Sequence, residues 1–72
     1  MTSIPKKGDR IRLVFMDDDP DPIQPGQLGT VVDLNVIGSE QTRWLQIAVD
    51  WDDGRSLMLA CPPDRFEIIS FS

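Results

Sequence analysis

The feature that most constrains the fold of this chain is that apolar residues occur at every second position. The pattern is found in several short segments, and turn-forming residues separate these segments. In residues 43–51 the positions Leu45, Ile47, Val49 and Trp51 form one apolar face. A period of two is the side-chain period of a β-strand that buries one face. No stretch shows the period of an amphipathic helix. The sequence therefore predicts an all-β protein.

The same pattern, punctuated by Gly, Pro and Asp, divides the chain into five short strands. The predicted strands span residues 8–16, 28–37, 43–51, 55–60 and 66–71. The connections are a long ordered loop with a Pro25-Gly26 turn, a turn at residues 38–41, a two-residue turn at Asp53-Gly54 and a break with a single 3₁₀ turn at residues 61–64. A partly open, five-stranded SH3-like barrel is the compact arrangement for this order of elements. An OB-fold is the alternative, but it needs a helix between its third and fourth strands.

The inward face of each predicted strand supplies the expected core. Its members are Ile11, Leu13, Val31, Ile47, Val49, Trp51, Leu57 and Ile68. Gly29, at the start of a strand, indicates a bulge or a close approach of two backbones. Trp44 lies outside the inward set, so it is either an exposed anchor for a partner or a cover over the open end of the barrel.

Composition sets the class of protein. We expect one domain over residues 1–72, with an ordered core at about residues 6–70, because 72 residues with 40% hydrophobic content suffice for one small core. No apolar run is long enough for a membrane span, and no signal peptide is recognisable. With a single cysteine, Cys61, the pattern favours a cytoplasmic protein without a disulfide framework or membrane contact.

The residue types exclude most catalytic chemistry. The chain has no histidine, the commonest general base, and one cysteine, too few for a zinc site. It has no Gly-rich phosphate loop. Cys61 is interpreted as a small buried apolar residue rather than a nucleophile. We therefore predict a protein that is not an enzyme and needs no cofactor.

Charge is distributed unevenly along the chain. Residues 1–16 carry four basic residues and one acidic residue, whereas residues 17–72 carry three basic and eleven acidic ones, for a total of −5. The candidate basic patch consists of Lys6, Lys7, Arg10 and Arg12. These side chains either face a phosphate backbone or form the solvated face of a strand and neutralise nearby aspartates, and we favour the second interpretation.

An aspartate cluster lies in the long first loop. It comprises Asp17, Asp18, Asp19 and Asp21. Clustered carboxylates bind Ca²⁺ in some loops, but Pro20 and Pro22 occupy positions that would have to turn around the ion. We favour turn formation and capping over a metal site, and we expect the loop and Trp44 to belong to an interaction surface.

Several motifs resemble a known family, DUF4314, whose members are short bacterial and phage-associated proteins or domains of unknown function. The resemblance covers residues 6–69 and rests on residues 7–13, Met16 with 18–23, Pro25-Gly26, 29–31, 51–57 and 64–68. It implies a small β-barrel and no particular activity. Residues 35–44 depart from the family pattern, because this stretch is longer and more polar.

Two functional hypotheses follow. The first is a non-catalytic module that binds another protein through the long first loop and the barrel face beside it. The second is a nucleic-acid-associated accessory protein that uses the basic first strand, which net charge −5 disfavours. Convergence of the four basic residues on one concave patch would favour the second.

Overall fold

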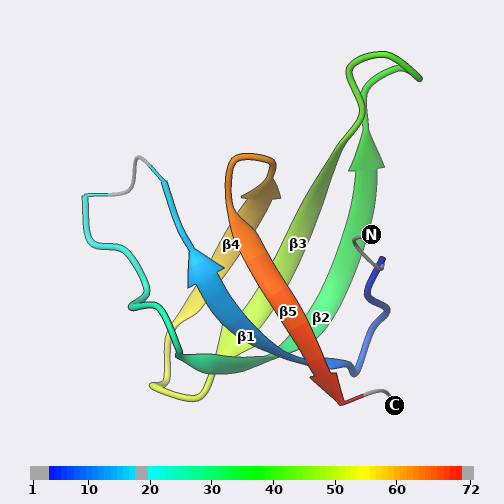
Figure 1. Ribbon diagram of the computed structural model, residues 1–72. Coiled ribbons are helices and arrows are strands. Elements are labelled where there is room, and N and C mark those ends of the chain that lie inside the picture. Colours follow the sequence, from blue (N-terminus) through cyan, green and yellow to red (C-terminus); the bar gives the residue numbers. More distant parts are fainter. Residues whose placement is uncertain (1–3, 18–19, 71–72) are drawn as a thin grey trace.

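The structure, a computed structural model, describes residues 4–17 and 20–70, and at Ser70 it describes the backbone alone. Its five strands are β1 (Arg10–Phe15), β2 (Leu28–Ile37), β3 (Trp44–Trp51), β4 (Ser56–Cys61) and β5 (Arg65–Ser70). They form one antiparallel sheet in the order β4-β3-β2-β1-β5, with β4 and β5 at its edges (Figure 1). The sheet is curved but not closed, which confirms the predicted all-β, partly open architecture.

Strand β2 joins the two halves of the sheet. Its first residues, from Leu28 to Thr30, pair with β1, and it pairs with β3 from Gly29 to Ile37. The β2–β3 register shifts between Val31 and Asp33. A bulge of this kind bends a strand and increases its twist, so β1 and β5 cross the direction of β3 and β4 in Figure 1.

The core lies between these two halves. Its fully buried hydrophobic members are Ile11, Leu13, Ile23, Val31, Ile47, Val49, Trp51 and Leu59. Six of the eight predicted core residues are among them, whereas Leu57 and Ile68 are half-buried against this cluster. Ile23 was not predicted, because it is a lone apolar residue inside the Asp- and Pro-rich loop.

Two predicted turns are wrong in detail. The β3–β4 loop has three residues rather than two: Gly54 N–H donates to Trp51 O at 3.0 Å, and Trp51 N–H donates to Arg55 O at 2.8 Å. Gly54 has the predicted positive φ, 95°, in the position that a three-residue hairpin reserves for a left-handed residue. Residues 62–64 form a turn and not a 3₁₀ turn, and Asp64 N–H donates to Ala60 O at 2.9 Å across it.

Gly29 confirms the expected close approach. A Cβ atom at this position would lie 2.6 Å from Val49 Cγ1 and 2.7 Å from Trp51 Cε3. Both side chains are buried core residues on the neighbouring strand β3. The lack of a side chain at Gly29 therefore lets the indole of Trp51 pack directly against β2.

Candidate binding groove

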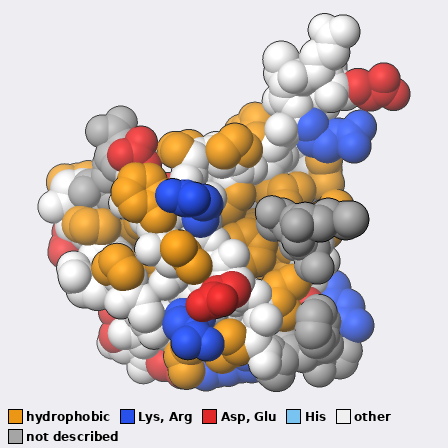
Figure 2. Space-filling model, viewed as in Figure 1, with side chains coloured by type: hydrophobic (Ala, Val, Ile, Leu, Met, Phe, Trp, Pro, Cys, Tyr) orange, Lys and Arg blue, Asp and Glu red, His pale blue; other side chains and the backbone are white. Residues whose placement is uncertain are grey.

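An apolar groove of about 470 Å³ opens between the loop end of the β2–β3 hairpin and the β4–β5 turn. Its apolar walls come from Ile4, Trp44, Leu45, Cys61, Pro62 and Phe66. Figure 2 shows hydrophobic side chains gathered beside the β2–β3 hairpin on this face. Three polar residues complete the lining: Arg43, Asp64 and Arg65.

The groove exists because β1 covers only part of the inner face of the sheet. Pairing between β1 and β2 stops at Thr30, while β2 continues to Ile37. The next inward row consists of Val36, Leu45 and Cys61, which are neighbours in the β2–β3 and β3–β4 registers. Leu45 and Cys61 are half-buried and Val36 is 52% exposed, so the apolar face continues beyond the core without being fully covered.

Trp44 forms the wall between this groove and a second hollow of about 530 Å³. The second hollow is lined by residues of the β2–β3 hairpin, including Gln41 and Thr42, and by Ala60 of β4. Arg43 and Pro62 also border both hollows. Trp44 is half-buried, and part of its surface is exposed at the end of the sheet where the core row is left open.

The carboxylate of Asp64 fixes the turn that borders the groove. Its Oδ1 accepts a hydrogen bond from Asp17 N–H at 2.8 Å, and its Oδ2 accepts one from Ala60 N–H at 3.0 Å. The Asp64 residue is only 8% exposed. These bonds tie the beginning of the long first loop to the edge strand β4 beside the groove. Asp64 was not among the predicted site residues, since its position after Pro62-Pro63 indicated only a turn.

Two arginines, Arg43 and Arg65, line the groove. Arg43 comes from the end of the β2–β3 hairpin, Arg65 is the first residue of β5, and both are exposed. The guanidinium carbon of Arg65 lies 5.8 Å from the centroid of the Phe15 ring, within the range of a cation–π contact. Phe15, 40% exposed, therefore extends the apolar surface beyond Arg65 toward the first loop.

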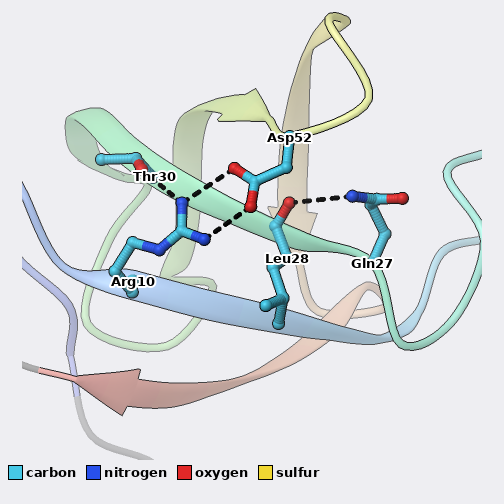
Figure 3. A network of polar contacts seen from close by, with 5 residues as sticks. All are labelled: Arg10, Gln27, Leu28, Thr30 and Asp52. Carbon is cyan, nitrogen blue, oxygen red and sulfur yellow. Dashed lines mark hydrogen bonds and ion pairs between the residues drawn. The ribbon is translucent and has the colours of Figure 1, made fainter.

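The two arginines of the predicted basic patch are paired with carboxylates. Arg10 donates two hydrogen bonds to the Asp52 carboxylate, at 2.8 and 2.6 Å, and a third to Thr30 Oγ1 at 2.9 Å (Figure 3). The hydrogen bonds from Arg10 lower the pKa of Asp52. Arg12 Nε lies 3.3 Å from a Glu67 carboxylate oxygen.

Two further hydrogen bonds near this pair join residues close in the sequence. Beside the Arg10–Asp52 pair, Gln27 donates its side-chain N–H to Leu28 O at 3.2 Å. Lys6 and Lys7 are exposed and precede β1, and Lys6 N–H donates to Asp9 Oδ2 at 2.8 Å. The structure thus ties two of the four predicted basic residues, Arg10 and Arg12, to carboxylates on other strands or turns.

The acidic loop is held to the rest of the protein at Asp21 and at Ile23. Ile23 enters the core, and Arg55 donates to Asp21 O at 2.7 Å and lies 3.8 Å from the Asp21 carboxylate. Of the predicted cluster, Asp18 and Asp19 lie outside the described residues. Within residues 4–17 and 20–70, no three His, Cys, Asp or Glu side chains are grouped to hold a metal ion.

The Cys61 thiol faces an environment that disfavours its ionised form. Burial, followed by the nearby Asp64 carboxylate, raises the pKa of Cys61 to about 12. A thiol is nucleophilic as its thiolate, and activated cysteines have lowered pKa values. Cys61 therefore remains protonated at neutral pH and serves as part of the groove wall.

These features define a small, open, five-stranded antiparallel β-domain with an apolar groove at the uncovered end of its sheet. The chain belongs to DUF4314, a domain of unknown function, whose sequence profile matches residues 3–69. No curated protein and no solved structure matches the chain. In the part of the chain that the structure describes, no helix is long and apolar enough to cross a membrane.

Proposed function

We propose that the protein is a non-catalytic binding module with an SH3-like barrel, that it acts in the cytoplasm, and that it holds an extended segment of another protein in the groove around Trp44. The strand order β4-β3-β2-β1-β5, with a long first loop and short later connections, supports the barrel type. The barrel type supports a binding function only by analogy between folds, so the proposed function rests on the groove.

The observation that carries the proposal is the apolar groove with Trp44 in its wall. Tryptophan is enriched among the residues that dominate binding energy at protein interfaces. The groove and the second hollow share Trp44, Arg43 and Pro62, which gives a continuous path along the end of the sheet. An extended segment fits such a path by placing side chains into successive hollows.

A selection from a phage-displayed random peptide library would test the proposal. We expect peptides that bind the wild type and lose about 30-fold or more in affinity to Trp44→Ala, because truncation of a central aromatic anchor typically costs about 2 kcal/mol or more. Met58→Ala is the matched control: Met58 is 47% exposed but lies outside the groove. Circular dichroism would establish that both variants are folded.

Three outcomes would contradict this function. The first is failure to enrich any peptide. The second is equal binding of the selected peptides to the wild type and to Trp44→Ala. The third is a dimer, seen by sedimentation, that Trp44→Ala dissociates, because the groove would then belong to a contact between two copies of this chain.

A nucleic-acid-associated role through the first strand is the alternative. The pairing of Arg10 with Asp52 and of Arg12 with Glu67 makes it the weaker proposal, because those cations already have partners. Fluorescence anisotropy with random duplex and single-stranded DNA at about 0.15 M salt tests it. We expect weak binding; sub-micromolar binding that Arg10→Ala and Arg12→Ala weaken would favour nucleic acid over protein.

A further inference from the structure

The arginines of this chain fall into two groups. Arg10, Arg12 and Arg55 each lie within ion-pair distance of a carboxylate, on Asp52, Glu67 and Asp21 respectively. Arg43 and Arg65 form no ion pair within the described residues, although acidic residues outnumber basic ones by twelve to seven. Both of these arginines line the groove.

Arg43 and Arg65 approach the groove from different elements, one from the β2–β3 hairpin and one from the start of β5. The carboxylate that lines the groove, Asp64, is buried and accepts hydrogen bonds from two backbone N–H groups. The groove is therefore a local site with apolar walls and two available guanidinium groups on a chain with net charge −5. The planar fork of a guanidinium group matches the geometry of carboxylates and of phosphates, and the apolar walls beside it favour a peptide over a nucleic acid.

We infer that the partner segment carries an apolar side chain flanked by acidic residues, with the apolar side chain in the groove beside Trp44 and the carboxylates on Arg43 and Arg65. This inference rests on the proposed function. The net negative charge of the domain opposes an acidic partner at long range, but salt screens that repulsion over about 8 Å at physiological ionic strength. Ion pairs at contact distance in a partly desolvated groove are screened much less.

Two labelled peptides and an oligonucleotide test the inference by fluorescence anisotropy. The acidic peptide has two glutamates on each side of a phenylalanine, the amide peptide has glutamines in their place, and the oligonucleotide is a short oligothymidine. We expect the acidic peptide to bind about threefold to tenfold more tightly than the amide peptide, as two partly exposed ion pairs allow. The double variant Arg43→Gln/Arg65→Gln should remove that advantage and leave the affinity for the amide peptide unchanged.

Arg12→Gln is the matched control, because it removes the same charge outside the groove. Equal affinities for the two peptides in the wild type would overturn the inference and leave the proposed function standing. Failure of both peptides to bind would overturn both proposals. Tighter binding of oligothymidine that depends on Arg43 and Arg65 would assign these cations to phosphate and overturn the acidic partner.

Discussion

Replacing Gly29 by alanine adds a single methyl group at a point where β2 and β3 are tightly packed. That methyl carbon would lie 2.6 Å from Val49 Cγ1, 2.7 Å from Trp51 Cε3 and 3.1 Å from Asp50 O. Ordinary contacts between carbon atoms are about 3.5–4.0 Å. Neither side chain can easily move away, because Val49 is 1% and Trp51 3% exposed. The indole of Trp51 is also held by its hydrogen bond to Leu57 O at 3.1 Å.

The expected cost follows from two opposing effects. Overpacking a well-packed core by one methyl group destabilises by about 1–3 kcal/mol. Alanine offsets about 0.4–1 kcal/mol of this, because it restricts the unfolded chain more than glycine does. We therefore expect Gly29→Ala to lower the free energy of unfolding by about 1–2 kcal/mol. In a domain of this size, that corresponds to a fall in Tm of about 5–15 °C.

Urea denaturation followed by tryptophan fluorescence measures this change, with an unchanged m-value as evidence that the folded state stays compact. Val49→Ala provides the control, because it removes the Cγ1 atom nearest to the new methyl group. In the double variant Gly29→Ala/Val49→Ala, the destabilisation should be smaller than the sum of the two single effects by about 0.5 kcal/mol or more. A Gly29→Ala protein as stable as the wild type would refute the close approach of β2 and β3.

Four further predictions address other parts of the molecule. Val49→Asp should unfold the domain, because a buried unpaired charge exceeds the stability of so small a fold; a cooperative melt at the wild-type Tm would show that the core assignment is wrong. Gly54→Val should destabilise by about 1 kcal/mol or more, since φ is 95° at this position; an unchanged urea midpoint would contradict that geometry. Asp52 has a pKa below its ordinary 3.8, so its ion pair with Arg10 stabilises the fold above that pH and loses its effect as the pH falls through the lower folded value. The difference in unfolding free energy between wild type and Asp52→Asn should therefore be present at pH 7 and shrink in acid, whereas a constant difference would exclude the ionised pair as its source. Native Cys61, with its pKa raised to about 12, should react with iodoacetamide at pH 8 about a hundredfold more slowly than in the urea-unfolded chain, and equal rates would refute its burial.

The strands and their inward faces could be predicted from the sequence because their signal is local. A period of two identifies both a strand and the face that it buries, and it placed Ile47, Val49 and Trp51 in the core. Local turn chemistry was less decisive: Gly54 has the predicted positive φ, but the loop also includes Asp52. A three-residue loop with a bulge and a two-residue loop both accommodate Asp-Gly, so the length of the loop depends on how the two strands twist relative to each other.

The tertiary structure alone decided where the inner face of the sheet is left open and which charged residues pair with each other. Strand β1 pairs with only the beginning of β2, which leaves Leu45 and Trp44 at an open groove, and no local pattern encodes that length of pairing. Arg10 donates a hydrogen bond to Asp52, which is 42 positions away in the sequence, and Asp64 accepts one from Asp17 N–H, 47 positions away. The sequence by itself determined an all-β domain and its buried faces because side-chain alternation is a property of neighbouring residues. Contacts between distant residues depend on the register of the whole sheet, so the groove and its two arginines, which form no ion pair among the described residues, emerged only from the folded chain.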